Sequence, residues 1–336
     1  MLTKKIVLKP MFITFLFSCL VLGPFSTFGQ NLSQEKKKIF VVMSYDLNYT
    51  GESLIKSGIE EILEGEFIRY FYLDTKKNLE KGPKKAQLAY ELYKKFNPDV
   101  IITVDDHAQS LFAVPYIKDK EKTPVVFCGV NDDASQYGYP TSQITGILEK
   151  KHYKQSLEFA KLILPEISKI AVIYKDNTSN RANVSQIEKE KSEYAVEVAE
   201  FIAIENIPQL SEEFGKLEKR VDALLVLNLA GITSYGGVKM GTIESMTYVS
   251  ENWPKATIGA SKREIQAGLL CAIAKINKEQ GLVAGQMAKD ILSGTPVELL
   301  PVTENRNGMR MINSSTAKRL GIKLTPLVLA EAELIN

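Results

Sequence analysis

The sequence predicts an α/β protein with two doubly wound parallel-sheet lobes joined by a three-strand hinge. Short β-branched runs such as Val100–Val104 and Val125–Val130 are separated by helix-length stretches, as in the buried strands of parallel sheets. The strand and helix signals then start again after about residue 142. A chain of 336 residues is also about right for two ordinary domains.

The first set of signals begins at Lys38. Its helical segments carry apolar residues at helical spacing, as Leu54, Ile55 and Ile59 do. Strands separated by helices imply right-handed crossovers in a parallel sheet. The predicted strands are 39–43, 67–73, 100–104 and 124–130, and the predicted helices are 51–63, 83–96 and 108–117.

The second set of signals follows an extended connection over 142–148. Two similar α/β units in tandem predict a two-lobed molecule. The predicted helices are 152–164, 180–193, 207–219 and 244–250, and the predicted strands are 170–174, 197–204, 223–227 and 256–260, followed by a turn at 261–263.

The closing segment predicts how the lobes are joined. It contains a strand over 268–274, a helix over 281–292, an extended piece over 297–303 and a last helix over 315–320. Chain left over after a second complete unit is most easily placed by crossing back to the first lobe and returning. We therefore expect a three-strand hinge, with lobe 1 formed by 30–147 plus about 276–303 and lobe 2 by 148–275 plus about 304–336.

Residues 1–29 predict a secretory signal peptide. Three lysines precede an uncharged run over about 11–28, and small residues stand at cleavage spacing near Gly29. A retained transmembrane anchor and lipid attachment at Cys19 are the alternatives. We expect removal after about Gly29, which makes the protein periplasmic or otherwise extracytoplasmic.

The charge of the chain argues against nucleic acid as a partner. Removal of residues 1–29 takes away three lysines and no acids, so the formal net charge falls from +2 to −1. Lysines also alternate with glutamates, as in Glu188–Lys191, which is typical of a solvated helix face. Such a chain has no basic excess to bind phosphate backbones.

Polar and aromatic residues follow the ends of the predicted strands. In parallel sheets, ligands bind beyond the carboxyl ends of the strands, and tyrosines there can stack on a flat ligand. The alternative for any one residue is a backbone role, because Asp, Asn and Ser are favoured at loop starts and helix N-caps. The candidate ligand contacts are Ser44, Tyr45, Asp46, Tyr49, Asp105, Asp106, His107, Asn131, Asp132, Tyr174, Asn177, Asn228 and Ser261.

We find no catalytic constellation, and we expect no enzyme, no metal and no cofactor. A metal site at Asp105–His107 needs further ligands, and the only other histidine, His152, lies at a predicted helix start. Cys128 lies within a predicted strand, and the chain has no G-x-S-x-G motif. We expect Cys128 and Cys271 to be buried free thiols. Asp105 or Asp106 is a candidate cap for the helix over 108–117.

The order of several segments resembles that of a known family. They are Pro98–Ile102, Pro124–Phe127, Ile144–Gly146, Lys169–Tyr174, Gly285–Gly294, Pro301–Val302 and Ala317–Ile322. The order is similar to that of the type I periplasmic substrate-binding proteins of ABC importers, and to the branch with tryptophan- and tyrosine-binding members in particular. The resemblance runs from about Lys38 to Glu331.

The resemblance implies a two-lobed protein that closes by hinge bending on a small ligand, such as an aromatic amino acid or a related metabolite, and delivers it to a membrane permease. Lobes that open freely favour a monomer. By position, it implies ligand contacts at the candidates named above other than Asp46 and Tyr49. Asp105–His107 is more acidic than the small-residue turn usual in aromatic amino-acid binders. Two carboxylates there suit an ammonium group or repel an anionic ligand.

Two other functions stay open at this point. One is a ligand-sensing extracytoplasmic subunit with the same fold, because the surface that docks on a membrane partner has no distinct sequence signal. The other is a secreted α/β hydrolase-type enzyme that uses Asp105, Asp106 or Cys128.

Overall fold

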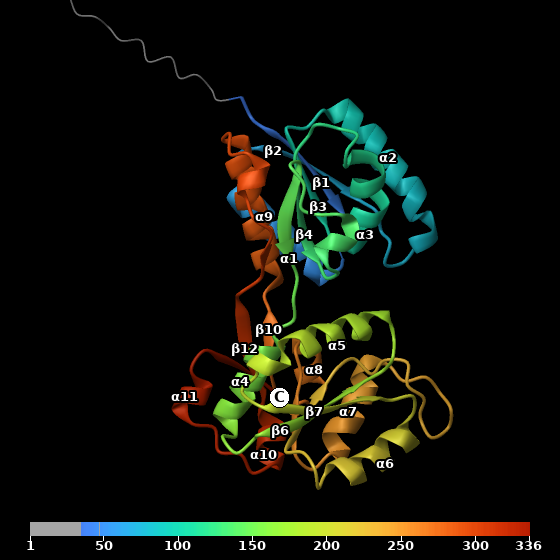
Figure 1. Ribbon diagram of the computed structural model, residues 1–336, viewed down its shortest axis with the longest axis vertical. Helices are drawn as coiled ribbons and strands as arrows, with labels where there is room; N and C mark the ends of the chain where they lie inside the picture. The colour runs from blue at the N-terminus through green and yellow to red at the C-terminus, as the bar shows by residue number, and fades with distance from the viewer. Residues whose placement is uncertain (1–34, 47) are drawn as a thin grey trace, which may run out of the picture. The chain divides into compact units, whose positions relative to one another are not determined.

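Two β-sheets form the framework of the protein (Figure 1). The computed structural model describes residues 35–46 and 48–336, so the predicted signal peptide and Cys19 lie outside the described residues. The strand order and the parallel pairing in the two sheets confirm the predicted fold class.

The first sheet has the strand order β11-β5-β4-β3-β1-β2, and all of its pairs are parallel. Its strands are β1 (Lys38–Met43), β2 (Phe67–Tyr72), β3 (Val100–Val104), β4 (Val125–Val130), β5 (Ile144–Leu148) and β11 (Thr303–Glu304). The helices of this lobe are α1 (Thr50–Ile62), α2 (Gly82–Phe96), α3 (Asp106–Ala108) and α9 (Asn277–Leu292), with a π-helical segment at Gln109–Ile117 and short 3₁₀ turns at Leu79–Lys81, Ala134–Tyr137 and Val297–Leu299.

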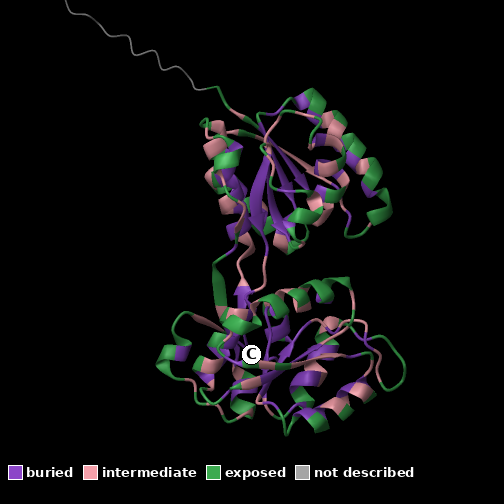
Figure 2. Ribbon diagram, viewed as in Figure 1, coloured by how far each residue is buried: buried purple, intermediate pink, exposed green. Residues whose placement is uncertain are grey.

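Alternate residues of each central strand face different helices. In β1, Ile39 and Val41 belong to the core cluster with α1 and α9, whereas Phe40 and Val42 belong to the cluster with α2 and the π-helical segment. Because both faces are covered, the strand is apolar along its length rather than alternating. Figure 2 shows these strands buried and the outer faces of the helices exposed.

The second sheet has the order β13-β12-β10-β9-β8-β6-β7, in which only the β10–β12 pair is antiparallel. Its strands are β6 (Lys169–Tyr174), β7 (Glu197–Ala203), β8 (Ala223–Val226), β9 (Ala256–Ile258), β10 (Cys271–Lys275), β12 (Gly308–Asn313) and β13 (Ala332–Ile335). Its helices are α4 (Tyr153–Ile163), α5 (Thr178–Glu190), α6 (Ile207–Leu217), α7 (Thr242–Asn252), α8 (Lys262–Gln266), α10 (Ser314–Arg319) and α11 (Pro326–Leu329), with a 3₁₀ turn at Lys191–Glu193.

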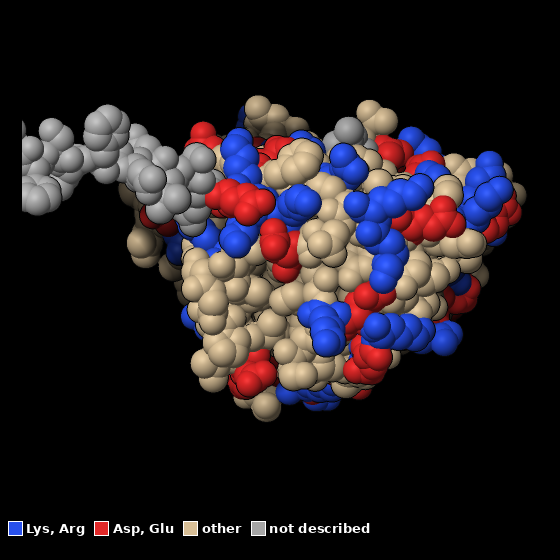
Figure 3. Space-filling model, turned by 90° about the horizontal axis from the view of Figure 1, so that it is seen from above, with Lys and Arg blue, Asp and Glu red and all other residues tan. Residues whose placement is uncertain are grey.

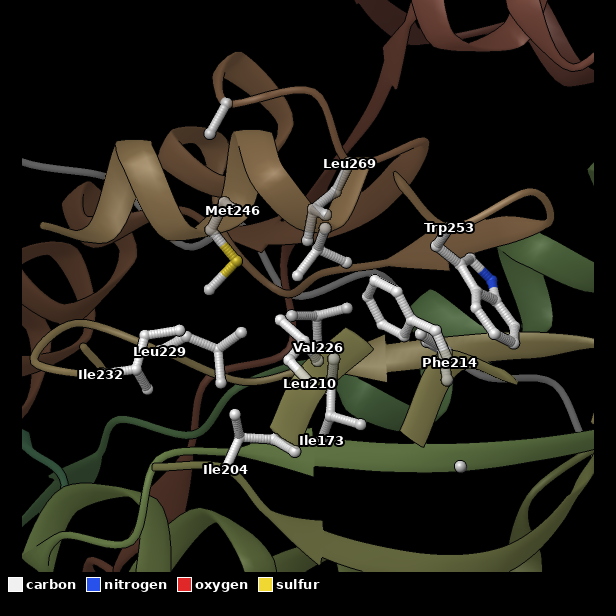
Figure 4. Packing of buried hydrophobic residues seen from close by; sticks show 14 of the residues in the cluster. Ile173, Ile204, Leu210, Phe214, Val226, Leu229, Ile232, Met246, Trp253 and Leu269 are labelled. Carbon is white, nitrogen blue, oxygen red and sulfur yellow. The ribbon is translucent and has the colours of Figure 1, made fainter. Parts of the chain in front are cut away.

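Aromatic packing anchors one face of the second sheet. Trp253, which follows α7, is fully buried, and its ring centroid lies 5.3 Å from that of Phe214 in α6. Figure 4 shows the Phe214 ring between Trp253 and the aliphatic side chains of Val226 and Ile173, which belong to the neighbouring strands β8 and β6. Large aromatic side chains supply much of the apolar burial in such a core.

Two predicted segments near the chain end differ from the structure. The turn expected at 261–263 begins the short helix α8, whose length is too small to give a helical apolar period. The extended piece expected over 297–303 is a 3₁₀ turn followed by the two-residue strand β11. The strands β12 and β13 and the helix α11 were not predicted. β12 is buried only in its second half and shows no continuous apolar run, and α11 and β13 are only four residues long each.

The chain passes between the two sheets three times. The connections are residues 149–152 between β5 and α4, residue 276 between β10 and α9, and residues 305–307 between β11 and β12. This is the predicted three-strand hinge, although the first sheet extends through Glu304.

Two buried polar side chains hold the connections together. Asn305 accepts a hydrogen bond from the backbone N–H of Lys150 at 2.6 Å and donates to the Lys150 carbonyl at 3.1 Å. Glu279, at the start of α9, accepts from the backbone N–H groups of Arg306 and Asn307 at 2.9 and 3.0 Å. Lys275 and Glu149 add an ion pair between the second connection and the first. The three connections therefore form one hydrogen-bonded unit.

The helices α1 and α9 pack closely enough to require glycine. A Cβ atom on Gly281 would lie 1.9 Å from the carbonyl oxygen of Ile55, and one on Gly58 would lie 2.5 Å from that of Lys278. No side chain fits at such distances. This contact fastens α9, which enters from lobe 2, to lobe 1 along the middle of α1.

Cys128 and Cys271 are buried and free within the described residues, which confirms the expectation for these two thiols. Burial raises the pKa of the Cys271 thiol to about 12.

Among residues 35–46 and 48–336, no helix has both the length and the apolar character needed to cross a bilayer. The face of the molecule in Figure 3 carries lysines and arginines interspersed with acids, without a continuous basic patch.

We predict that Gly281→Ala lowers the free energy of unfolding by about 1–3 kcal/mol, as overpacking of a tight contact does. Urea denaturation followed by circular dichroism measures the change. The matched control is Gly215→Ala in α6, where a Cβ has no neighbour within 4 Å and should stabilise by about 0.5–1 kcal/mol. Equal effects of both substitutions would argue against the close α1–α9 contact.

We predict that Asn305→Ala lowers the free energy of unfolding by about 1–3 kcal/mol, because it leaves the partly buried backbone groups of Lys150 without these partners. The same urea titration measures it. Asn252→Ala is the control, since Asn252 is exposed and bonds only within α7. A neutral result at Asn305 would contradict the bonded hinge.

Candidate functional site

A cleft of about 530 Å³ lies between the two lobes. Lobe 1 contributes residues that follow β1, β3 and β4 together with the start of α1, and lobe 2 contributes α5 and the residue after β8. The carboxyl ends of these parallel strands meet here, as the general rule for such sheets requires. The hinge connections form a further wall through Glu149, Lys150, Lys151, Lys275 and Asn277.

Eight of the predicted contacts line this cleft. Seven lie on lobe 1 and one on lobe 2, so the polar tips of both sheets do reach a common space. They are Tyr45, Tyr49, Asp105, Asp106, His107, Asn131, Asp132 and Asn228.

The other predicted contacts do not line the cleft and have local roles instead. Ser44 is fully buried, where its hydroxyl donates to the Val104 carbonyl at 2.6 Å and accepts from the Ala108 N–H at 2.8 Å. Asp46 pairs with Lys77 at 2.5 Å. Tyr174 packs on the second-lobe core, and Asn177 caps α5 through its side chain. Ser261 occupies the N-cap position of α8, where its side chain makes no capping hydrogen bond.

Two tyrosines form an aromatic corner on the lobe 1 wall. The ring centroids of Tyr45 and Tyr49 lie 5.1 Å apart in an edge-to-face arrangement. The Nζ atom of Lys76 lies 4.8 Å from each centroid, within the range of a cation–π contact. The corner therefore offers both a flat apolar surface and a site that already attracts a cation.

Asp105 is held in a strained backbone conformation beside this corner. Its φ and ψ are 70° and 168°, a region that residues other than glycine rarely occupy and that costs on the order of 1–3 kcal/mol. Its carboxylate accepts hydrogen bonds from the Tyr45 hydroxyl at 2.9 Å and from the Asp106 N–H at 2.8 Å. Burial, and then repulsion from Asp106, raises the pKa of Asp105 to about 7. As expected for one of the two acids, Asp105 also caps the short helix α3.

Asp106 organises the loop after β4 rather than presenting free oxygens. Its carboxylate accepts four hydrogen bonds, from the backbone N–H and side-chain amide of Asn131, the backbone N–H of Asp132 and the hydroxyl of Tyr137. The last of these measures 2.9 Å. Burial, together with the charge of Asp106, raises the pKa of Asp132.

Helix α5 supplies the wall from lobe 2. Its buried Asn180 donates to the carbonyls of Lys175 and Asn228 at 2.7 Å each, which ties the ends of β6 and β8 to the first turn of the helix. Asn183 and Gln186 lie one and two turns further along α5 and line the same cleft. This wall is made of amide and hydroxyl groups, whereas the lobe 1 wall is aromatic and acidic.

Several cleft residues lie outside the sequence-based set. Thr178, Ser179, Asn183 and Gln186 belong to α5, whose polar face gives no sign of what it faces. Glu52 belongs to α1, and its position directly after Gly51 in an amphipathic helix predicts solvent exposure, yet it is only 2% exposed. The only sequence signal for Glu52 was that it is an acidic residue in the first turn of a helix, where the helix dipole favours negative charge.

Within the part of the chain that the structure describes, no three His, Cys, Asp or Glu side chains gather as a metal site requires. His107 bonds instead to the Thr75 hydroxyl at 2.7 Å, and burial lowers its pKa.

Comparisons with known proteins agree with this architecture. A search of curated proteins finds no match. Among solved structures, CD0873 from Clostridium difficile, described as a ligand-free, open substrate-binding protein with adhesive properties, is similar with a TM-score of 0.70 and 18% identity, over 89% of this chain and 99% of that one.

Two further structures show the same fold. An ABC domain from Streptococcus pneumonia in complex with L-Trp matches with a TM-score of 0.57 and 19% identity, over 90% of this chain and 100% of that one. A conserved domain protein from Vibrio cholerae matches with a TM-score of 0.55 and 17% identity, over 90% and 100%.

The family model described as ABC transporter substrate binding protein matches residues 39–335, which includes both sheets, all three hinge connections and every cleft residue. Members of this family bind solutes. The chain therefore belongs to the ABC transporter substrate-binding protein family.

Proposed function

We propose that this protein is the exported receptor of an ABC importer and that its cleft binds an aromatic amino acid or a related metabolite. The observation that carries the proposal is the Tyr45–Tyr49 corner, which stands beside buried carboxylates and across from the amide-rich face of α5. Aromatic walls with a few polar groups are typical of small-molecule sites, and about 530 Å³ suits a ligand of this size. The L-Trp complex of a protein with the same fold supports this ligand class.

Binding by closure follows from the way the walls are divided. Each lobe holds only part of the lining, so a ligand that contacts both walls stabilises the arrangement in which they approach. The hydrogen-bonded connections at Asn305 and Glu279 are the place where such bending occurs. The closed form is then the one that a membrane permease recognises.

The receptor is proposed to bind its solute without converting it. An enzyme that uses Asp106 for acid–base chemistry needs a free carboxylate oxygen, and both oxygens of Asp106 already accept hydrogen bonds from the β4 loop. Cys128 is fully buried within β4, and burial raises the pKa of its thiol.

We further propose that the protein acts as a monomer outside the cytoplasm after loss of residues 1–29. The family's role as a partner of membrane permeases supports this location. Cleavage after Gly29 would leave all of β1 in the mature chain, since β1 begins at Lys38.

We predict that L-tryptophan or L-tyrosine raises the melting temperature of the chain produced without residues 1–29. A ligand at about 100 times its dissociation constant adds about 2.7 kcal/mol, which corresponds to several degrees. Differential scanning fluorimetry measures the shift, with D-glucose as the control solute. The absence of a shift with every aromatic amino acid would exclude this ligand class.

We predict that Tyr49→Ala weakens binding of the same amino acid by about three- to tenfold, because one edge-to-face aromatic surface is lost. Isothermal titration calorimetry measures the dissociation constant. Tyr235→Ala is the matched control, since Tyr235 is 69% exposed and does not line the cleft. If both variants bind equally well, the aromatic corner is not part of the site.

A further inference from the structure

Glu52 brings a buried carboxylate oxygen without a donor to the wall of the cleft. Its Oε1 accepts a hydrogen bond from the backbone N–H of Tyr45 at 2.8 Å. Its Oε2 is buried and accepts no hydrogen bond from any residue that the structure describes. A buried acceptor left unpaired is costly, and a ligand donor that reaches it recovers that free energy.

Tyr45 places a second carboxylate beside Glu52. While its backbone N–H donates to Glu52, its hydroxyl donates to Asp105 at 2.9 Å. The charge of Asp105 acts on Glu52 as a repulsion. Two acids held on one wall by a common residue favour a positively charged group near both.

The lysines of the cleft are engaged elsewhere. Lys76 lies over the two tyrosine rings, and Lys151 lies over the ring of Tyr153. Lys150 donates to the Asn131 carbonyl at 3.4 Å, and Lys275 pairs with Glu149. The ionisable residues that act on Glu52 are Tyr45, Asp46, Tyr72, Asp105 and Cys128. Lys76, Glu149 and Lys275 line the same cleft. Within the described residues, Glu52 has no cationic partner.

We infer that Glu52 and Asp105, joined through Tyr45, form a subsite for the protonated amino group of the ligand. The inference rests on the proposed function, and it identifies the group of the solute that the lobe 1 wall recognises. Asp105 contributes its charge, and the unpaired Oε2 of Glu52 contributes the acceptor.

A proton exchange accompanies this recognition. Burial raises the pKa of Glu52 to about 8, and Asp105 has a pKa of about 7, so the pair holds a proton near neutral pH in the ligand-free protein. When the ammonium group enters, its charge favours the ionised carboxylates, and the carboxyl proton leaves to solvent. Binding of an amine therefore releases a proton and strengthens as the pH rises from about 6 to about 8.5.

The first test uses matched probes on the unmodified protein: L-tryptophan, tryptamine, which lacks the carboxylate, and indole-3-propionate, which lacks the amine. We expect L-tryptophan and tryptamine to bind at least about tenfold more tightly than indole-3-propionate, as for one charge-assisted hydrogen bond. Equal binding of L-tryptophan and indole-3-propionate overturns the subsite but leaves the proposed function standing. If none of the three probes and none of the corresponding tyrosine series binds, both proposals fail.

The second test uses Glu52→Gln, which keeps the shape of the side chain and removes its charge. We expect the variant to bind L-tryptophan about tenfold more weakly at about pH 8, to bind indole-3-propionate unchanged, and to lose most of the increase in affinity with pH. Calorimetry in buffers of different ionisation enthalpy counts the protons released, and the count should fall in the variant.

Glu60→Gln is the matched control, because Glu60 lies on the same helix but pairs with Lys56 at the surface. It should bind all three probes as the unmodified protein does. A merely structural role for Glu52 predicts that every probe weakens equally with no change in proton release, and that result overturns the inference.

Discussion

The contact between α1 and α9 is the constraint on which the rest of the molecule depends. α9 enters lobe 1 from the second sheet, and it fits there only because Gly58 and Gly281 let two backbones touch. The same contact fixes Glu279 at the start of α9, where its carboxylate accepts hydrogen bonds from the backbone of the third hinge connection. It also fixes the first turn of α1, which carries Glu52 to the cleft. Hinge and binding wall are thus set by one close packing of helices.

The lobe 1 wall combines backbone strain with neighbouring acidic groups, and hydrogen bonds from the surrounding residues stabilise this arrangement. Asp105 has a backbone conformation that suits glycine, and it lies near two other acids in a buried setting. Hydrogen bonds from Tyr45 and from the backbone of Asp106 hold it in place. Strain and like charge at one place are common where a protein keeps binding groups ready for a partner. The lobe 2 wall has no such strain, since its Asn180 satisfies two strand-end carbonyls.

The sequence was informative about which strands are buried. It was not informative about the direction in which a given side chain points. Continuous apolar strands are buried on both sides, so β3 and β4 and the acidic residues just after them could be predicted. β12 is half exposed, and no run of apolar residues marks it. In the cleft, Asp105 and Asn131 were accessible to prediction because parallel strands end at one edge. Ser44 follows the same rule, yet it turns inward to bond Val104, and only side-chain direction separates the two outcomes.

The two buried thiols give each lobe its own reporter. Cys128 belongs to a central strand of the first sheet and Cys271 to a central strand of the second, and neither is exposed to solvent in the folded state. A thiol reagent can modify either one only when its own sheet opens, so the two modification rates record the local unfolding of the lobes separately. The molecule therefore carries an internal measure of whether its halves unfold together or one at a time.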